Sequence, residues 1–400
     1  MPPQHRQLGT HPPDEPPKPS IYRCSGRPEH RKTAMPDPML PPPATSTDRP
    51  EPAPVRIGSV EVGPGRRAYV IAEAGVNHNG NEDAAHRMID AALAAGADAV
   101  KFQAFRAADL ASPDADAAGY QKNATGMSSQ RTMLESLELP ADAFDRLARH
   151  CGRDGIEFLA TPFGIRDLHM LRDLGMRAVK IASTDLNNLP LLDEVVATGL
   201  PIILSTGASL PEELDATVQR LRERRADDRL ILLHCVSSYP TPWNQANLRR
   251  IQHLNARYEL PTGFSDHTQS IGTGSLAVAA GACVIEKHFT LDGSLPGPDQ
   301  ALSLEPGLLA EYIERIREAE AALGTGDLAP RACEREVRQV ARKSIVAARP
   351  IAAGEILDAA CLAAKRPAGG LEPRALHSLL GKRARTPIPP DTQITWAMVE

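Results

Sequence analysis

The 400-residue chain has few of the residues that define several protein classes. Aromatic residues make up only 4% of it, and its six cysteines are scattered without a CxxC pair. This spacing argues against a cysteine-based zinc motif and a disulfide scaffold, and it indicates a reducing compartment. No apolar run approaches the ~20 residues that span a bilayer, and no charged-then-apolar leader opens the sequence. We therefore predict a cytoplasmic protein that does not bind membranes.

An excess of basic residues is also absent. The chain has 45 Lys and Arg against 50 Asp and Glu, for a formal net charge of −5. A general nucleic-acid-binding protein is normally basic, so this balance argues against that class. The hydrophobic content of 42% and the charged content of 24% are instead typical of a globular protein with a sizeable core.

Proline is concentrated at one end. Residues 1–54 contain 16 of the 36 prolines and show no periodic apolar pattern. Such a segment buries too little apolar surface to offset the entropy of ordering it. We predict that residues 1–54 form a disordered tail.

From Ala68 onward, short apolar runs typical of β-strands alternate with helical segments. The segment 210–225, for example, opens with acidic residues and closes with arginines, as the helix dipole prefers. The first strand is not followed by GxGxxG, which argues against a dinucleotide-binding sheet. Eight strands alternating with helices predict an α/β fold, a (β/α)8 TIM barrel over residues 55–330. The predicted strands lie at 68–75, 99–105, 157–163, 178–184, 201–207, 230–236, 261–267 and 283–289.

The end of the chain has a different pattern. A helix predicted at 306–323 closes the barrel, and a glycine-containing break follows at 324–327. Residues 337–400 contain short apolar runs separated by Pro and Gly, which predicts a small, mostly β domain with one short helix at 373–380.

Polar residues occur at or after the ends of nearly all the predicted strands. In a parallel barrel the reactive groups lie at the carboxyl ends of the strands, so these residues should line one cavity. Lysine inside an apolar strand needs an anionic partner, and Lys101 and Lys180 therefore suggest an anionic ligand with phosphate or carboxylate groups. The predicted cavity residues are Glu73, Lys101, Gln103, Thr161, Lys180, Ser183, Asp185, Ser205, Thr206, His234, Ser237, Tyr239, Ser265, His267, Glu286 and His288.

Two of these residues suggest a metal. His267 and His288 end neighbouring strands, so their imidazoles can reach one cation, although spacing alone also fits two hydrogen-bonded core histidines. Two nitrogens with waters and a carboxylate suit Mn²⁺ or a similar divalent ion, whereas a structural zinc needs four protein ligands. For His234 and Cys235, a buried core position is the simpler interpretation.

The ordered motifs resemble the sialic acid synthase family over residues 57–400. They are "VIAEAGVNHNG", "KFQAF", "FLATPF", "KIAS", "ILSTGAS", "LLHCVSSYPTP", "GFSDHT" and "EKHFTLD…GPDQALSLEP". "SIVAARPIAAGEIL" and "KRPAGG" resemble the antifreeze-like SAF domain of that family. The resemblance implies condensation of phosphoenolpyruvate with N-acetylmannosamine or a related 2-acetamido sugar, with loss of phosphate by C–O cleavage.

The resemblance also implies roles for individual residues. His267 and His288 would hold Mn²⁺, and Glu73 would relay protons beside it. Lys101, Lys180, Ser183, Ser205 and Ser265 match positions around phosphoenolpyruvate, and Gln103, Tyr239 and Asp299 match groups that orient the sugar or water. Arg366 matches an arginine that enters the barrel of the other subunit in a domain-swapped homodimer, and Lys343 is a weaker match to a phosphate contact.

Three departures from the family pattern leave the sugar open. Ser237 replaces an Asn, Asp185 replaces a Glu, and "RPAGG" replaces "RPGxG". Substitutions of this size could select a 2,4-diacetamido 6-deoxy sugar instead of N-acetylmannosamine.

Two other classes of function fit some of the residues. A Schiff-base aldolase would use Lys101 or Lys180 as the nucleophile that attacks a carbonyl. A non-catalytic protein would bind glycan or ice through residues 337–400 and use the barrel as a scaffold, but a scaffold does not need lysines inside its strands.

Overall fold

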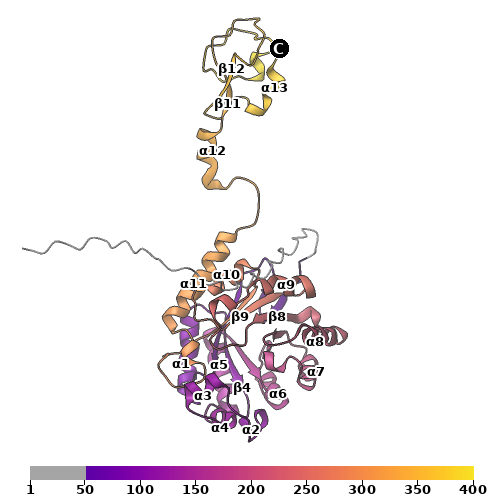
Figure 1. The fold of residues 1–400 in the computed structure, drawn as a ribbon, viewed down its shortest axis with the longest axis vertical. Helices are drawn as coiled ribbons and strands as arrows, with labels where there is room; N and C mark the ends of the chain where they lie inside the picture. The colour runs from indigo at the N-terminus through magenta and orange to yellow at the C-terminus, as the bar shows by residue number, and fades with distance from the viewer. Residues whose placement is uncertain (1–50) are drawn as a thin grey trace, which may run out of the picture. The chain divides into compact units, whose positions relative to one another are not determined.

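The computed structural model describes residues 51–400 of the chain. The predicted tail, residues 1–54, falls almost wholly outside this range and stays a prediction. The core of the described part is a single eight-stranded parallel sheet (Figure 1). Its strands are β3 (Tyr69–Gly75), β4 (Ala99–Ala104), β5 (Glu157–Pro162), β6 (Val179–Ile181), β7 (Ile202–Ser205), β8 (Leu230–Cys235), β9 (Thr262–Asp266) and β10 (Val284–His288).

The sheet curves into a nearly closed barrel. The hydrogen-bonded order is β5-β4-β3-β10-β9-β8-β7-β6, and the two end strands, β5 and β6, also lie next to each other. Register brings the strand ends to one level: Glu73 pairs with Lys101 on one side and with His288 on the other. The prediction of a (β/α)8 barrel is confirmed, and the register explains why polar residues far apart in sequence meet.

Helices follow the strands and cover the outside of the sheet (Figure 1). Because both faces of the sheet are covered, the strands are apolar along most of their length and buried. The helices are α1 (Glu82–Ala94), α2 (Ala107–Leu110), α3 (Gly119–Thr125), α4 (Gln130–Glu135), α5 (Ala141–Asp154), α6 (Ile165–Asp173), α7 (Leu189–Ala197), α8 (Pro211–Glu223), α9 (Arg249–Tyr258), α10 (Thr273–Ala279) and α11 (Pro306–Leu323). Short 3₁₀ helices are η1 (Ser183–Asp185), η2 (Asp227–Arg229), η3 (Trp243–Gln245) and η4 (Gln300–Leu302).

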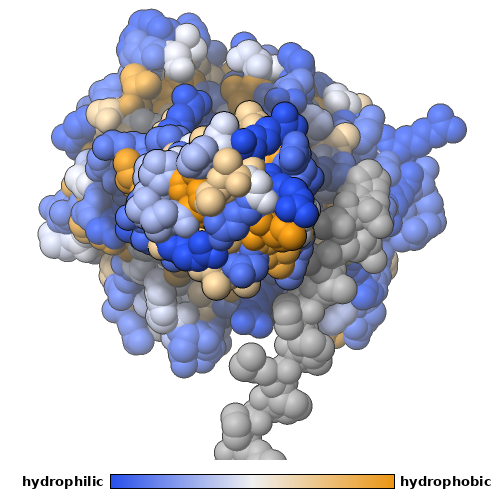
Figure 2. All heavy atoms as spheres, turned by 90° about the horizontal axis from the view of Figure 1, so that it is seen from above, coloured by the Kyte–Doolittle hydropathy of each residue, from blue (hydrophilic) through white to orange (hydrophobic). Residues whose placement is uncertain are grey.

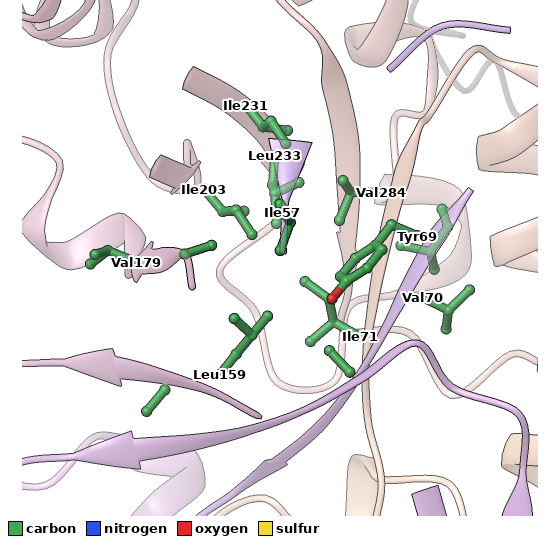
Figure 3. Close-up of a cluster of buried hydrophobic side chains, with 14 of the residues drawn as sticks. Ile57, Tyr69, Val70, Ile71, Leu159, Val179, Ile203, Ile231, Leu233 and Val284 are labelled. Atoms are coloured by element: carbon green, nitrogen blue, oxygen red, sulfur yellow. The ribbon is translucent and has the colours of Figure 1, made fainter. Parts of the chain in front are cut away.

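A small hairpin that the sequence did not predict precedes the barrel. Its strands are β1 (Val55–Ile57) and β2 (Val60–Val62). Figure 3 shows Ile57 among side chains that the barrel strands contribute, and Ile57 is only 1% exposed. Gly58 lies against Glu157 at the start of β5, so the hairpin packs at the amino ends of the strands. The carboxyl ends are therefore left for a site.

A second difference is the long connection between β4 and α5, residues 105–140. It contains the three short helices α2, α3 and α4, which have too few turns to produce a clear amphipathic pattern in the sequence. Ser129 caps α4 through its side chain, which accepts a hydrogen bond from the backbone N–H of Thr132. We refer to residues 105–140 as the insert.

The C-terminal domain has its own hydrophobic core, built around Ile345, Leu357 and Ile394. Its strands β11 (Ser344–Ala347) and β12 (Leu362–Lys365) pair antiparallel. A helix that was not predicted, α12 (Arg335–Ala341), precedes them, whereas the predicted helix at 373–380 is present in part. The remaining elements are η5 (Ala332–Glu334), η6 (Pro373–Ala375), α13 (Leu376–Leu379) and η7 (Trp396–Met398).

Most of the face shown in Figure 2 is hydrophilic, and its apolar residues form small patches. Within residues 51–400, no helix combines the length and the apolar composition that a membrane crossing requires.

Two buried histidines of the barrel should make stability depend on pH. Burial lowers the pKa of His78 and of His234 to about 4, so the folded protein keeps both rings neutral. In the unfolded chain, histidine takes up a proton near pH 6.5. Acidification therefore favours unfolding, and each ring should lower the free energy of unfolding by about 2 kcal/mol between pH 7 and pH 5.

His234→Gln tests this effect, because glutamine can still donate to the carbonyl of Ala246, which His234 Nε2 contacts at 2.8 Å. In urea denaturation, the difference in unfolding free energy between pH 7 and pH 5 should be about 2 kcal/mol smaller in the variant than in the wild type. His253→Gln, on an exposed position of α9, is the control. Equal pH dependence in the His234 variant and the wild type would contradict the prediction.

Candidate active site

One cavity of about 430 Å³ opens among the carboxyl ends of the barrel strands. This is the end at which parallel barrels carry their reactive groups, because each strand there passes into a variable loop. Fourteen of the predicted residues line it: Glu73, Lys101, Gln103, Thr161, Lys180, Ser183, Ser205, Ser237, Tyr239, Ser265, His267, Glu286, His288 and Asp299.

Four buried charges form the floor of this cavity. Lys101 Nζ lies 2.5 Å from Glu73 Oε2 and 3.5 Å from Glu286 Oε2, and Lys180 Nζ lies 3.8 Å from Glu286 Oε1. Each of these side chains is at most 5% exposed. We call this group the charge cluster. Both lysines are already paired, so an anionic ligand must share or displace a carboxylate to contact them.

Glu286 was noted in the sequence as a polar strand residue but received no role. Its position opposite Ser265 in the strand register lets Ser265 Oγ donate a hydrogen bond of 2.7 Å to Glu286 Oε1. Glu286 thus connects both lysines and a predicted ligand-binding serine. The sequence signal was available, because Glu286 alternates with His288 on one strand face.

The two carboxylates differ in their affinity for protons. Burial raises the pKa of Glu73 to about 7, and the nearby charge of Glu286 adds to this, while Lys101 opposes it. Burial also acts on Glu286, but Lys101 and Lys180 together hold its pKa below the usual range. Glu73 is therefore the group in the cluster that can gain and lose a proton near neutral pH.

Hydroxyl groups surround Lys180. Lys180 Nζ donates a hydrogen bond of 2.8 Å to Ser205 Oγ, and the hydroxyls of Ser183 and Ser237 lie 3.2 Å apart. A side chain on Gly207 would collide with Ser237 Oγ at 2.3 Å, so only glycine leaves room here. An ammonium with several hydroxyl donors is suited to a phosphate or carboxylate group.

The two predicted metal-binding histidines lie together, with ring centroids 5.6 Å apart. His267 Nδ1 is 2.7 Å from the carbonyl oxygen of Val236, which assigns the proton to Nδ1 and leaves Nε2 unprotonated. Nε2 lies 3.4 Å from Ser265 Oγ and is the ring atom that can bind a cation. His288 Nδ1 is buried without a hydrogen bond, 3.9 Å from Asp299 Oδ2. Burial lowers the pKa of both rings, so both are neutral, as metal ligation requires. These donors fit a divalent cation.

A second buried ion pair supports this arrangement from the opposite face of the same strands. Lys287 Nζ and Asp266 Oδ2, both fully buried, lie 3.0 Å apart. Tyr312 of α11 donates a further hydrogen bond of 2.9 Å to Asp266. Because Asp266 and Lys287 directly precede the two histidines, this pair holds β9 and β10 in the register that brings the rings together.

Aromatic and acidic side chains complete the rim. Tyr239 lies against His267 with centroids 4.3 Å apart, and Tyr120 of the insert stacks on Tyr239 at 5.3 Å. Burial raises the pKa of Asp299 to about 6. Tyr120 was not predicted as a site residue, because the helix that carries it was not recognised.

Five predicted residues do not line the cavity in the described part of the chain. Thr206 and His234 are buried in the barrel, where their side chains contact the backbone carbonyl oxygens of Leu233 and Ala246. Asp185 is half-buried in η1, where its Oδ1 accepts a hydrogen bond of 2.8 Å from Asn188. Lys343 and Arg366 belong to the C-terminal domain and are exposed. Their predicted roles are therefore not accounted for by the barrel cavity alone.

Another group of metal-ligating atoms lies outside the barrel on α1 and α5. Ligand atoms of Asp90, His150 and Asp154 lie within 4.8 Å of one another, which is compatible with a divalent metal. Arg153, however, already contacts both carboxylate oxygens of Asp154, at 2.7 and 2.9 Å. Three arginines also line the hollow beside His150, and their charge disfavours a cation. Paired histidines in the barrel are the better candidate.

Comparison with known families gives two matches. The NeuB family matches residues 88–328, and the SAF domain matches residues 342–400. The two matches together cover the greater part of residues 51–400.

The chain is also similar to individual proteins along most of its length. It is 38% identical to the N,N'-diacetyllegionaminic acid synthase of Legionella pneumophila, over 83% of this chain and 94% of that protein. It is 32% identical to the human N-acetylneuraminate-9-phosphate synthase, over 85% and 94%. Among solved structures, an N-acetylneuraminic acid synthetase from Leptospira borgpetersenii in complex with citrate has a TM-score of 0.64 at 37% identity, covering 72% of this chain and 95% of that one.

The charge cluster predicts the effect of removing one member. Lys101→Met leaves Glu73 and Glu286 buried without their shared cation, which should lower the free energy of unfolding by roughly 3–5 kcal/mol. The double variant Lys101→Met, Glu73→Gln should recover part of this loss, because Glu286 keeps its pairing with Lys180 and the carboxyl group left without an ion-pair partner is removed. Urea denaturation measures both.

Lys122→Met is the matched control, since Lys122 pairs with Asp116 on the exposed surface of the insert. That variant should lose less than about 1 kcal/mol. A loss of the same small size for Lys101→Met would show that the cluster does not depend on its ammonium group.

Proposed function

The chain belongs to the NeuB family and carries a C-terminal SAF domain, and from this premise we propose that it is a nonulosonic acid synthase. We propose that it condenses phosphoenolpyruvate with the open-chain form of N-acetylmannosamine or a related 2-acetamido sugar. The observation that supports this most is the meeting of two neutral imidazoles, two lysines and a proton-accepting carboxylate in one cavity.

The proposed reaction joins C3 of phosphoenolpyruvate to the aldehyde carbon of the sugar. Formation of this bond uses the enol π electrons and leaves an oxocarbenium centre at C2, while the aldehyde oxygen takes up a proton. Water then adds to C2, and phosphate leaves by cleavage of the C–O bond. This chemistry needs cations for the phosphate and carboxylate, a group that transfers protons, and an electrophile at the aldehyde. The lysines and Glu73 are suited to the first two requirements, and His267 and His288 are the proposed ligands of the cation that would meet the third.

Lys101 and Lys180 are the proposed anchors for phosphoenolpyruvate, with hydroxyls from Thr161, Ser183 and Ser205 as hydrogen-bond donors. Lys101 contacts Thr161 Oγ1 at 3.1 Å, so the lysine and the hydroxyl can face one anion together. Both lysines already form ion pairs with Glu286. The bound anion would therefore share their charge with this carboxylate. Ser237 and Ser265 are proposed to complete this part of the site.

Glu73 is the proposed proton-transfer group. Its pKa, raised to about 7, allows it to accept a proton and return it within one turnover. Gln103 Nε2 lies 3.3 Å from Glu73 Oε1 and can hold the carboxylate in position. Asp299, also with a raised pKa, is the second carboxyl group that can exchange protons beside the histidines.

His267 and His288 are the proposed ligands of a divalent cation, with Mn²⁺ as the first choice. Bound there, the cation would supply a Lewis acid that polarises the sugar aldehyde. The chain itself contributes two pre-formed neutral nitrogen donors and the aromatic ring of Tyr239, which lies against His267 and limits access of bulk water.

A homodimer is the proposed functional form. Arg366 and Lys343 do not line the cavity of their own barrel, yet they resemble residues that contact substrate in this family. We infer that the C-terminal domain of one subunit completes the site of the other, with Arg366 holding the acetamido group. Asp185 is proposed to contribute at the edge of the sugar site through η1.

A Schiff-base aldolase is the second candidate, because burial lowers the pKa of Lys180, as a nucleophilic amine requires. Treatment with borohydride and pyruvate separates the two reactions. Only an aldolase forms a stable covalent adduct, detectable as a mass increase, whereas the proposed synthase stays unmodified.

The direct test measures phosphate release from phosphoenolpyruvate with N-acetylmannosamine and with its 2,4-diacetamido 6-deoxy analogue. Wild-type protein with Mn²⁺ should release phosphate with at least one sugar. Chelation should abolish release, and His267→Ala should lower kcat by a factor of at least 100, because one of the two proposed metal ligands is lost. His253→Ala, at an exposed position, is the control. No release with any 2-acetamido sugar would contradict the proposed function.

Mixing of inactive variants tests the dimer. His267→Ala impairs the barrel, and Arg366→Ala impairs the C-terminal domain. In mixed dimers that exchange domains, one of the two sites is intact, so random mixing should restore about a quarter of the wild-type activity. Activity no higher than that of the separate variants would show that each barrel works with its own C-terminal domain.

A further inference from the structure

Apolar side chains form another part of the cavity lining, which we call the apolar wall. The wall consists of Val76, Leu110, Met133, Leu134, Leu137 and Phe163. Met133 and Leu137 are almost fully buried, whereas Leu134 is half-buried and Leu110 is 36% exposed. Leu110 and Leu134 are therefore the apolar side chains of the insert that a ligand can contact most directly.

This wall is a packed structure of its own. Met133 and Leu137 form a small hydrophobic cluster with Val76 and Phe105, separate from the main barrel core. The ends of the insert are also tied together, because Asp116 and Ser129 form a β-bridge and the Glu138 carboxylate accepts a hydrogen bond from the N–H of Ala107. The apolar side chains are thus held in place before a ligand binds.

The insert also reaches the proposed reaction centre. Tyr120 stacks on Tyr239, which in turn lies against His267. A sugar whose aldehyde faces the histidines would pass these rings and direct its other end toward the insert. The insert also contributes two uncharged polar side chains, Gln121 and Gln130, to the cavity lining. None of its charged side chains lines the cavity.

An apolar wall distinguishes the possible sugars by the group at C6, the end of the open chain opposite the aldehyde. A hydroxymethyl group placed there loses hydrogen bonds to water without finding a partner, whereas a methyl group gains contact. Apolar pockets discriminate only modestly against a ligand with one added hydroxyl, by a factor of the order of 100. The wall should therefore produce a preference and not absolute exclusion.

We propose that Leu110 and Leu134 of the insert determine sugar specificity and favour the 6-deoxy analogue of N-acetylmannosamine over N-acetylmannosamine itself. This inference rests on the proposed function. It assigns a role to residues 105–140, which neither the charge cluster nor the histidine pair requires.

The test compares kcat/KM for the two sugars, with phosphate release as the readout. The wild type should prefer the 6-deoxy analogue by roughly 10–200-fold, because the two sugars differ only by the hydroxyl at C6. Leu134→Asn and Leu110→Ser each add a hydrogen-bonding group to the wall, and each should reduce this ratio at least fivefold, mainly through KM for the 6-deoxy sugar. Leu276→Asn is the matched control, because Leu276 is 48% exposed on α10 and does not line the cavity. That ratio should not change in the control.

A binding measurement separates the inference from the proposed reaction. The two sugars reduced to alditols have no aldehyde and cannot condense, so calorimetry reports their affinities alone. Tighter binding of the 6-deoxy alditol, weakened by Leu134→Asn, supports the inference even if no phosphate is released. Equal kcat/KM values and equal affinities for the two sugars, or ratios unchanged by both substitutions, would overturn it.

Discussion

The site depends on the burial of four charges at one end of the barrel. Lys101, Glu73, Glu286 and Lys180 lie where water cannot solvate them, so each must be held against an opposite charge. The parallel register meets this requirement by setting Glu73 beside Lys101 and Glu286 beside Ser265. The same burial raises the pKa of Glu73 toward neutrality. The anion binding and the proton transfer that we propose thus both depend on this burial.

The rest of the molecule confines chemistry to this end of the barrel. The β1–β2 hairpin, through Ile57, packs at the amino ends of the strands, and helices cover the outside of the sheet. The buried pair of Asp266 and Lys287 holds the two histidine-bearing strands together from the outer face. The cavity is lined by charged groups and imidazoles from the strands and by apolar side chains, most of them from the insert. Such a lining suits the proposed pairing of a small, highly charged substrate with a larger, uncharged one.

The C-terminal domain makes the barrel incomplete in the proposed function. It has its own core, and its exposed Arg366 and Lys343 do not line the cavity formed by residues of the barrel. A family relationship that covers both the barrel and the SAF domain is consistent with a site shared between subunits. In the proposed dimer, the C-terminal domain of one subunit would contact the barrel of the other.

Local sequence patterns determined the strands, the barrel and the histidine pair. Strands buried on both faces appear in the sequence as short apolar runs, and the alternation of side chains along a strand shows which polar residues share a face. The helix at 306–323, for instance, was predicted with the bounds that α11 has. Tertiary structure alone decided the rest. The hairpin strands have three residues each and the insert helices α2–α4 have at most seven, too few for a periodic signal, so Tyr120 and the leucines of the wall were not recognised. The role of Glu286 was also decided by the tertiary structure. Glu286 contacts two lysines that are more than 100 residues away in the sequence, and this contact depends on the order of the strands in the sheet. Spacing along the chain does not encode that order.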